Sequence, residues 1–468
     1  MSKNFPERLA DIVGAGNVLT APEDVKPYLT DARRLYTGRA EFVVRPGSTA
    51  EVSRLVALCA AEDMAIVPQG GNTGLSGGSV PIGARRELVL SLSRLNRIRE
   101  LDALNDTITV EAGCVLATVQ QAAEGAGRFF PLSLGAEGSC QIGGNLSTNA
   151  GGVNVLRYGM AREQVLGIEV VLPDGRVWDG LRALRKDNTG YDLKQIFLGA
   201  EGTLGIITAA VLRLRPRPTA NVTALVGVET PRRAVELLAA LRGRLGERLS
   251  AFELISRPSL EAVLSHLRDK DPLPAPHPWY VLTEIADGGE TTLLHEQVEQ
   301  ALAGAAEVGL LRDATLAQSV TQARGLWKLR ESIPEAQFVN VKHDISVAVS
   351  KIPELVDRLA VALRARFPDV YPYVFGHVGD GNLHFNVSAL PDAARGEFLA
   401  RADGVRRAIH DLVHEFGGSV SAEHGIGRLK VGELERYAPP VELELMRAVK
   451  RAFDPHGIMN PGKVLRQE

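Results

Sequence analysis

The sequence predicts an α+β protein with two or three domains. Three observations support this prediction. The length of 468 residues suits more than one hydrophobic core. Glycine-rich segments are concentrated in the first half of the chain, and strands alternate with helices after the proline-rich segment 215–219. We therefore expect one domain at residues 1–217, a second at residues 218–453, and an irregular tail at residues 454–468.

The composition is that of a globular protein in water. Hydrophobic residues make up 45% and charged residues 23% of the chain, and the net charge is −3, which gives no reason to expect a nucleic acid or an anionic membrane as a partner. Three scattered cysteines, Cys59, Cys114 and Cys140, suggest a reducing compartment. The N-terminus lacks an apolar signal core and no apolar run is long enough to span a bilayer. We expect a cytoplasmic protein without a transmembrane segment.

The first domain is expected to begin with an amphipathic helix at residues 6–14. A strand at 42–45, a helix at 49–62 and a strand at 64–68 have β-α-β spacing. Further elements are predicted as strands at 88–92, 107–111 and 206–214, a helix at 115–125, and a hairpin formed by 165–172 and 176–178.

The second domain is expected to be a sheet covered on one face by helices. Its predicted strands are 221–228, 249–255, 279–286 and 343–349. Its predicted helices are 231–244, 291–307, 353–366, 393–415 and 440–453.

The segment Gly70-Gly71-Asn72-Thr73-Gly74-Leu75-Ser76-Gly77-Gly78 is the first glycine-rich loop and follows a predicted strand. Backbone without side chains lets amide groups converge on an anion, so the segment is a candidate pyrophosphate loop. It fits neither the dinucleotide fingerprint nor the phosphate loop that ends in Gly-Lys-Ser/Thr. A flexible surface loop is the alternative.

Two more glycine-rich segments follow in the same domain, at 135–152 and 197–207. The first is long and poor in large side chains, and such a stretch within a compact domain is usually functional. The second runs directly into a predicted strand. The three segments together suggest a ligand that lies along backbone.

His377 and His384 flank the sequence Val-Gly-Asp-Gly-Asn-Leu. Their odd separation would place them on opposite faces of one continuous strand. Gly379 and Gly381 argue against a helix and should break the strand, which could bring both imidazoles to one point. Two separate, hydrogen-bonded histidines are the alternative.

Glu423 and His424 lie in a loop between glycines. Glu423 could complete a site of two histidines and one carboxylate, the ligand pattern of a catalytic zinc with one open position. His424 would then be a candidate general base. The alternative is an exposed Glu-His pair.

Arg330 and Lys342 could bind an anionic substrate, or could be ordinary surface charges.

These segments resemble a known family. The segments 68–74, 135–152, 157–159, 186–194 and 199–207 resemble the FAD-binding domain of the vanillyl-alcohol-oxidase type. The segments 376–384 and 421–427 resemble the companion substrate domain of the FAD-linked D-2-hydroxyacid dehydrogenases, and the chain is most similar to the D-2-hydroxyglutarate branch of that family. The resemblance implies a two-subdomain FAD-binding domain and a substrate domain built on an antiparallel sheet.

The resemblance also implies how FAD is bound. Asn72 stands where members that tether FAD covalently often carry a histidine, so the cofactor is expected to be non-covalent. The loop 70–78 would hold the pyrophosphate, and Asn460 in the tail would return to the flavin. The FAD-binding residues implied are Pro68, Gly70, Gly71, Asn72, Thr73, Gly74, Gly77, Gly78, Gly135, Ser139, Gly143, Gly144, Asn145, Thr148, Gly152, Glu201, Gly202, Ile207 and Asn460.

The resemblance assigns the remaining residues to a metal and a substrate. His377, His384 and Glu423 resemble ligands of a divalent metal, usually zinc, and His424 resembles the catalytic base in contact with substrate. The other residues that resemble substrate contacts are Arg330, Lys342 and Asn382. Pro334 is a departure, because some hydroxyglutarate enzymes carry a hydroxyl residue there to bind the distal carboxylate.

The activity implied is oxidation of a D-2-hydroxy acid to the 2-oxo acid, with D-2-hydroxyglutarate as the first choice. D-lactate or glycolate dehydrogenase and an oxygen-using FAD oxidase are alternatives within the family, and a non-catalytic binding protein is the alternative outside it. An electron-transfer flavoprotein or a quinone-linked carrier is the expected electron acceptor, and a homodimer is one expected assembly.

Overall fold

The computed structural model describes residues 3–83, 85–337, 340–390 and 395–467. The chain forms two compact units. The first comprises Met1–Gly151, Met160–Arg217 and Glu423–Glu468, and the second comprises Gly152–Gly159 and Pro218–Ala422. The segment 423–453, which we had expected in the second domain, therefore belongs to the first unit.

The first unit contains a four-stranded sheet with the order β1-β2-β4-β3. Strands β2 (Phe42–Val44), β4 (Glu87–Ser91) and β3 (Ala65–Gln69) are parallel, and β1 (Val18–Leu19) is antiparallel to β2. Helix α3 (Thr49–Ala61) connects β2 to β3, as the β-α-β spacing predicted, and Ser48 caps its N-terminus. Helix α1 (Phe5–Val13) is capped reciprocally by Asn4 and Glu7.

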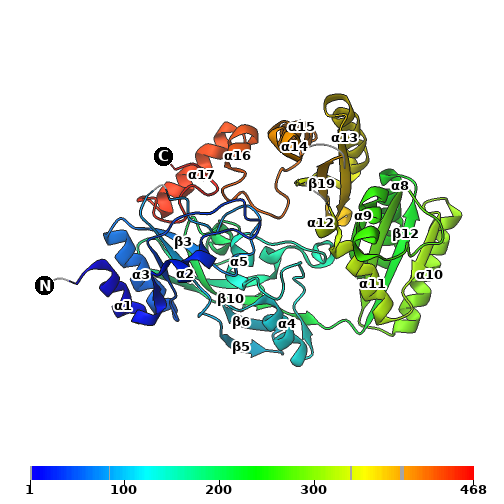
Figure 1. The fold of residues 1–468 in the computed structure, drawn as a ribbon. Coiled ribbons are helices and arrows are strands. Elements are labelled where there is room, and N and C mark those ends of the chain that lie inside the picture. The colour runs from blue at the N-terminus through cyan, green and yellow to red at the C-terminus, as the bar shows by residue number, and fades with distance from the viewer. Residues whose placement is uncertain (1–2, 84, 338–339, 391–394, 468) are drawn as a thin grey trace. The chain divides into compact units, whose positions relative to one another are not determined.

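A second sheet of the first unit is antiparallel, with the order β5-β6-β10-β8-β9 (Figure 1). Its strands are β5 (Ile98–Asp102), β6 (Thr107–Glu111), β10 (Ile206–Arg213), β8 (Val165–Val171) and β9 (Val177–Gly180). Helices α4 (Leu116–Gly125) and α5 (Ile142–Ser147) contribute Leu116, Val119 and Leu146 to the apolar core beneath it. The hairpin β8–β9 is confirmed.

Shorter elements complete the first unit. These are α2 (Pro22–Val25), the pair β7 (Arg128–Phe129) and β11 (Arg215–Pro216), α7 (Lys194–Phe197), α16 (Val431–Tyr437) and α17 (Pro440–Phe453). The tail after α17 returns to the four-stranded sheet. The amide of Ile66 donates to the carbonyl of Ile458, the amide of Asn460 donates to the carbonyl of Ile66, and Met459 is buried in the core.

The second unit contains one large antiparallel sheet with the order β15-β12-β14-β13-β18-β19-β16, and β17 also pairs with β19. Its strands are β12 (Ala220–Val228), β13 (Leu249–Ser256), β14 (Trp279–Asp287), β15 (Asp313–Leu316), β16 (Asn340–Val341), β17 (Asp344–Ser346), β18 (Val370–Gly376) and β19 (Asn382–Ala389). The antiparallel sheet is as predicted, but the single strand expected at 343–349 is short and is preceded by β16.

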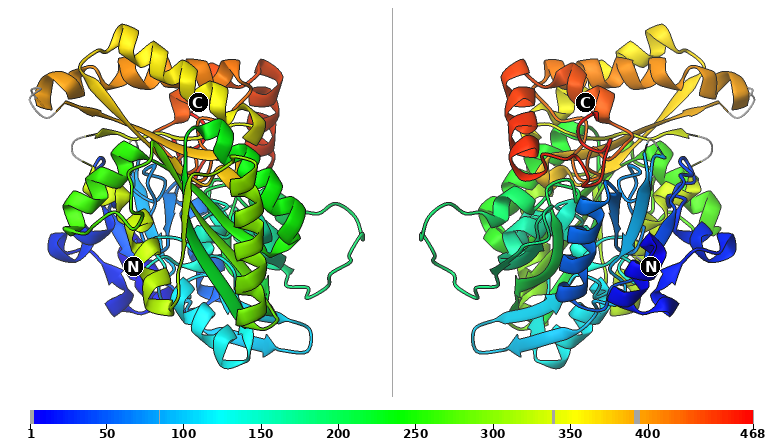
Figure 2. Two further views of the ribbon diagram at one scale, coloured as in Figure 1. Left: turned by 90° about the vertical axis from the view of Figure 1, so that its right-hand side faces the viewer. Right: turned by 90° about the vertical axis from the view of Figure 1, so that its left-hand side faces the viewer.

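Helices lie on both faces of this sheet, whereas we had expected one covered face. Helices α9 (Arg257–Leu267), α11 (Val320–Glu331) and α12 (Ile333–Ala336) pack on the face that carries Leu225 and Ile255. Helices α8 (Pro231–Leu245) and α10 (Thr291–Glu307) pack on the other side of β12, and the left view of Figure 2 shows them beside the strands. The reason can be seen in β12 and β13, which are buried almost without interruption rather than at alternate positions.

The remaining helices of this unit are α6 (Val155–Tyr158), α13 (Ile352–Arg366), α14 (Arg395–Ala400) and α15 (Ala402–Glu415). The helix predicted at 393–415 is interrupted at Arg401, and its first two positions lie outside the described residues. No helix of the described segments has both the length and the apolar character needed to cross a membrane.

Candidate active site

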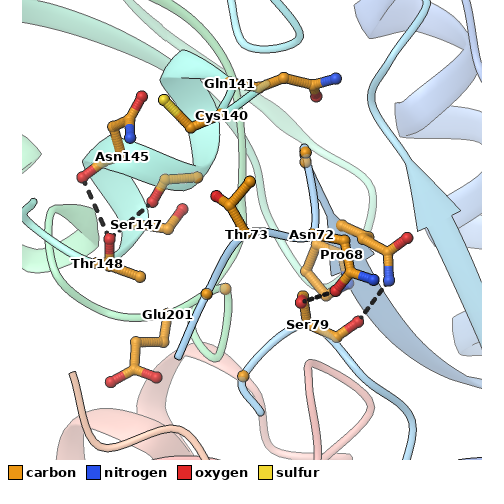
Figure 3. Close-up of a pocket in the computed structure, with 18 of the residues that line it drawn as sticks. Pro68, Asn72, Thr73, Ser79, Cys140, Gln141, Asn145, Ser147, Thr148 and Glu201 are labelled. Atoms are coloured by element: carbon orange, nitrogen blue, oxygen red, sulfur yellow. Dashed lines mark hydrogen bonds between the residues drawn. The ribbon is translucent and has the colours of Figure 1, made fainter. Parts of the chain in front are cut away.

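A cavity in the first unit is lined by all three glycine-rich segments that the sequence singled out (Figure 3). His424 lies in its wall. The predicted cofactor residues that line this cavity are Pro68, Gly70, Gly71, Asn72, Thr73, Gly74, Gly78, Gly143, Gly144, Asn145, Thr148, Glu201, Gly202 and Ile207. Segments far apart in sequence thus form one cradle, and we call it the glycine cradle.

The first glycine-rich loop leaves β3 at Gln69 and is fixed by side chains on both sides. The Gln69 amide donates to the carbonyls of Tyr28 and Ser79. Asn72 has a left-handed backbone with φ of 53°, and its side chain donates to Thr30 O and accepts from Ser79 Oγ, each at 2.8 Å. The loop is therefore held in one conformation, which argues against the flexible-surface alternative.

The first and second glycine-rich segments approach each other closely at Gly71. A side chain placed there would bring its Cβ within 2.0 Å of the carbonyl oxygen of Ser139. Only glycine permits this approach of two backbones. The second segment continues into α5, where the Thr148 hydroxyl donates to the carbonyl of Gly144 at 3.0 Å.

The chemistry of the cradle fits FAD. The side-chain oxygens of Gln141 and Asn145 are buried and have no hydrogen-bond partner within the described chain, and both residues line the cavity. A buried acceptor of this kind is costly unless a donor reaches it. Ribityl hydroxyls or an adenine amino group would supply such donors. Open space surrounds the missing Cβ positions of Gly74 and Gly144, which lets a ligand lie against the backbone.

The third glycine-rich segment joins the cradle to the C-terminal tail. Glu201 has φ of 51° and Asn460 has φ of 42°, and the Asn460 amide donates to the carbonyls of Gly78 and Glu201. The Glu201 carboxylate is buried, which raises its pKa, while hydrogen bonds from the amides of Ile426 and Gly427 act in the opposite direction. Asn460 therefore ties the tail to two cradle segments.

Five predicted cofactor residues do not line the cavity: Gly77, Gly135, Ser139, Gly152 and Asn460. Gly77 packs against the ring of Tyr36, and Gly135 is exposed. Gly152 belongs to the second unit. Ser139 and Asn460 touch the cradle segments through the contacts described above. The lining residues that the sequence analysis did not name individually include Ser76, Gln141 and Ser147, and their position inside the glycine-rich segments was the available signal.

The backbone of the loop that carries His424 contacts Ser76 of the first glycine-rich segment. Ser76 Oγ lies 3.2 Å from the carbonyl oxygen of His424 and 3.3 Å from that of Gly425. The imidazole Nε2 lies 4.0 Å from a carboxylate oxygen of Glu423. The imidazole therefore lies in the wall of the glycine cradle with a carboxylate nearby.

In the second unit, β18 ends at Gly376 and β19 begins at Asn382, with a short 3-10 turn at Val378–Asp380 between them. The glycines do break the strand, as predicted. The rings of His377 and His384 consequently lie 5.8 Å apart between centroids, nearly perpendicular to each other. The break thus brings the two rings close together, and a shared role of the two imidazoles stays a prediction.

His377 and Arg330 share a buried carboxylate. Nδ1 of His377 lies 2.5 Å from Oε1 of Glu253, and Nε of Arg330 donates to Oε2 at 2.6 Å. Burial raises the pKa of Glu253, but the charges of His377 and Arg330 outweigh it and bring the pKa down to about 2. Arg330 also stacks over the ring of Phe375 at 4.9 Å. The contact with Glu253 uses Nε and leaves the two terminal guanidinium nitrogens of Arg330 out of this hydrogen bond.

His384 has a carboxylate opposite it on the neighbouring strand. Asp344 on β17 is the register partner of His384 on β19, and their ligand atoms lie within 4.8 Å of each other. Phe375 is the partner of His384 on the other side, so these side chains share one face of the sheet. Asp344 adds an oxygen donor that the sequence analysis did not assign.

The two remaining predicted substrate residues differ in their surroundings. The Asn382 amide donates to Asp344 Oδ1 at 2.9 Å and to the carbonyl of Ile345 at 3.0 Å, and its own Oδ1 is buried with no partner among the described residues. Lys342 is exposed, between β16 and β17. Asn382 therefore orients Asp344, and Lys342 lies on the surface of its unit.

Glu253 and Asp344 are the buried carboxylates at the candidate site that sequence reasoning missed. Glu253 is the one charged residue in the strand Leu249–Ser256, all of which is buried. A lone carboxylate in such a strand requires a charged partner, and this was a usable signal. Asp344 follows Lys342 and His343 directly, so its role could be assigned only from the register of β17 against β19.

Comparisons with known proteins support the same conclusions. Residues 40–180 match the model described as "FAD binding domain", and residues 217–464 match the model described as "FAD linked oxidases, C-terminal domain". The chain is 40% identical over 463 residues to the D-2-hydroxyglutarate dehydrogenase of Xanthomonas citri pv. viticola, covering 97% of this chain and 96% of that protein. It is 39% identical to the enzyme of that name from Stutzerimonas stutzeri, covering 98% of each chain.

The mitochondrial D-2-hydroxyglutarate dehydrogenase of Danio rerio is 40% identical, with 96% of this chain and 83% of that protein covered. Among solved structures, p-cresol methylhydroxylase superposes with a TM-score of 0.77 at 18% identity, covering 98% of this chain and 96% of that one. The 4-ethylphenol oxidase of Gulosibacter chungangensis has a TM-score of 0.73 at 18% identity, with the same coverage. These structures confirm the vanillyl-alcohol-oxidase type of fold. With both domain models matched and relatives of this identity along nearly its whole length, the chain belongs to the family of FAD-linked oxidases.

Proposed function

We propose that the protein is an FAD-dependent dehydrogenase that oxidises D-2-hydroxyglutarate to 2-oxoglutarate. The observation that carries the proposal is the position of His424 in the wall of the glycine cradle. The curated relatives that bear the name D-2-hydroxyglutarate dehydrogenase support the choice of substrate. Bound FAD would accept the hydride that leaves the substrate α carbon.

Besides FAD, the protein would bind a divalent metal. His377, His384 and Glu423 are the proposed ligands, and Asp344 is an additional oxygen donor beside His384. A metal bound to the substrate hydroxyl would lower the pKa of that hydroxyl. Two imidazoles with carboxylate oxygens form a donor set suited to zinc and to other divalent ions.

Different residues of the chain would then remove the proton and bind the substrate. His424 would accept the hydroxyl proton, since an alcohol is far too weak an acid to ionise unaided near neutral pH. The terminal nitrogens of Arg330 would bind a substrate carboxylate, and Glu253 would hold the guanidinium in place through Nε. Lys342 and Asn382 remain proposed substrate contacts, Asn382 through Oδ1.

The test is anaerobic reduction of the bound flavin by D-2-hydroxyglutarate. We expect His424→Ala to retain FAD but to bleach at least 10²-fold more slowly, which is the usual contribution of a general base. His456→Ala, which removes an exposed histidine of the same unit, is the matched control and should bleach at the wild-type rate. Bleaching of His424→Ala at the wild-type rate would remove His424 from the role. A purified protein without a flavin spectrum would favour the non-catalytic alternative.

One observation favours a second substrate. Pro334 in α12 has no side-chain donor at the position where a hydroxyl residue could bind a distal carboxylate. D-lactate or glycolate is therefore the alternative substrate class. A panel of these acids with D-2-hydroxyglutarate, compared by flavin bleaching, separates the two.

Peroxide formation under air would favour an oxidase, whereas reduction of an artificial dye or an electron-transfer flavoprotein would favour a dehydrogenase.

Three further proposals concern the electron acceptor, the assembly and the cellular location of the protein. A quinone-linked carrier is the other proposed electron acceptor, and a homodimer is the proposed assembly, to be tested by light scattering. We propose a cytoplasmic location because the three cysteines are free and buried, although the names of some relatives include "mitochondrial".

A further inference from the structure

The carboxylate of Glu201 does not simply face the cofactor cavity. Its Oε1 accepts a hydrogen bond from the amide of Ile426 and its Oε2 accepts one from the amide of Gly427, each at 2.7 Å. Figure 3 shows the carboxylate pointing toward the C-terminal part of the chain, away from Thr73. The two amides belong to the residues that follow His424 and Gly425.

The position of Glu201 is itself fixed by the cradle. Its amide donates to the carbonyl of Ser147 at 2.8 Å, and its carbonyl accepts from the Asn460 amide at 2.7 Å. Its backbone is left-handed, which is uncommon for a residue other than glycine. Such a conformation persists only where the surroundings impose it, and it is concentrated at functional sites.

The loop that carries His424 fits Glu201 closely. A Cβ on Gly425 would lie 2.7 Å from Oε1 of Glu201, and a Cβ on Gly427 would lie 2.2 Å from the carbonyl oxygen of Ser76. Both glycines have positive φ. Ser76 holds the opposite side, because its carbonyl accepts from the amides of Arg428 and Leu429. The loop is therefore clamped between Glu201 and Ser76.

Only a carboxylate satisfies both amides at once. It offers an acceptor oxygen to each donor, whereas a glutamine in the same place offers one oxygen and one NH₂ group. That NH₂ group would face an N–H, so the loop would have to move. A displacement of about 1 Å at a reacting group can lower a rate about 10²-fold.

We propose that Glu201 is a positioning residue, which holds the imidazole of His424 against the glycine cradle by binding the backbone of residues 426–427. This inference rests on the proposed role of His424 as the base. Glu201 would thus influence proton removal without touching the substrate.

The test combines Glu201→Gln, His424→Ala and the double variant, each loaded with FAD and bleached anaerobically with D-2-hydroxyglutarate. We expect Glu201→Gln to retain FAD, to keep the wild-type substrate dependence, and to bleach about 10²-fold more slowly. The double variant should bleach no more slowly than His424→Ala, because residues that act as one unit are non-additive. Glu111→Gln alters another buried carboxylate, which is bound by Arg97. It is the matched control, because it measures how much the bleaching rate falls through structural disturbance alone.

The outcomes separate the two claims. Wild-type bleaching by FAD-loaded Glu201→Gln, or a further loss in the double variant beyond His424→Ala, overturns the positioning role. Wild-type bleaching by His424→Ala overturns the proposed base instead. If Glu201→Gln does not fold, Gly425→Ala pushes the loop off the intact carboxylate, and wild-type bleaching by that variant also overturns the inference.

Discussion

Nδ1 of His377 donates a hydrogen bond to the buried carboxylate of Glu253. The low pKa of Glu253, about 2, keeps this carboxylate ionised, so it can only accept and the proton must be on Nδ1. When this imidazole is neutral, its lone pair is therefore on Nε2. A carboxylate that orients a histidine in this way raises the affinity of the histidine for a metal.

We accordingly expect Glu253→Gln to weaken binding of zinc or another divalent ion by about 10- to 100-fold, the usual effect of losing such a partner. Titration against a chromophoric chelator measures the change. Glu284→Gln is the matched control, because Glu284 is a half-buried carboxylate of the same sheet that binds Trp327 instead of a histidine. Equal metal affinity in Glu253→Gln and wild type would contradict the assignment.

Removal of the metal should abolish the reaction but not the binding of FAD. We expect a chelator to stop flavin bleaching by D-2-hydroxyglutarate while the flavin spectrum persists, since the glycine cradle contains none of the proposed metal ligands. Addition of a divalent ion should restore bleaching. Full activity in a sample whose metal content has been shown to be negligible would rule out the metal.

FAD should leave the protein intact when the chain is unfolded. Asn72 carries an amide in place of a nucleophilic imidazole, and both ends of that amide are already bound to Thr30 and Ser79. We expect acid precipitation to leave all of the yellow colour in the supernatant, with the mass of unmodified FAD. Flavin that remains with the precipitate would show a covalent bond.

Lys463 should make stability depend on pH in the alkaline range. Its side chain is 2% exposed, its Nζ has no hydrogen-bond partner among the residues described, and burial lowers its pKa from 10.5 to about 8. Glu87 opposes this shift and Arg428 adds to it. Between pH 8 and 10.5 the unfolded state binds more protons than the folded state, so this lysine makes the free energy of unfolding rise with pH.

The contribution should amount to about 3 kcal/mol across that range. Denaturant unfolding of wild type and Lys463→Met at several pH values measures it as the change in their difference in free energy of unfolding. The free energy of unfolding of wild type should rise relative to that of Lys463→Met as the pH rises from 8 to 10.5. Lys26→Met, at an exposed position, should follow wild type throughout. A constant difference between wild type and Lys463→Met would show that the ammonium is not destabilised by burial.

The cradle could be predicted because its signal is local. Glycine-rich segments that follow strands are visible in the sequence, and the structure brings residues of all three to one cavity. Gly77 and Gly135 show the limit of this reasoning, since one packs on Tyr36 and the other is exposed. A glycine can serve a turn or a close approach as well as a ligand, and composition does not distinguish these uses.

The substrate side could be predicted only in part. The break between His377 and His384 follows from two glycines, and β18 and β19 confirm it. The roles of Glu253 and Asp344 depend on pairing with residues more than a hundred and about forty positions away, respectively. Such register is set by the whole sheet. Helices on both faces were likewise missed, although the nearly continuous apolar runs of β12 and β13 are typical of strands that are buried on both faces.

The return of the tail to β3 has a consequence for biosynthesis. Ile458 and Met459 complete the core around Ile66, and Asn460 joins the cradle segments at Gly78 and Glu201. Domains generally fold as they emerge from the ribosome, N-terminal parts first, but this unit lacks its strand-like partner for β3 until residues 458–460 have been translated. We therefore expect stable flavin binding only after residues 458–460 have been made, so a nascent protein stalled before residue 458 should be colourless.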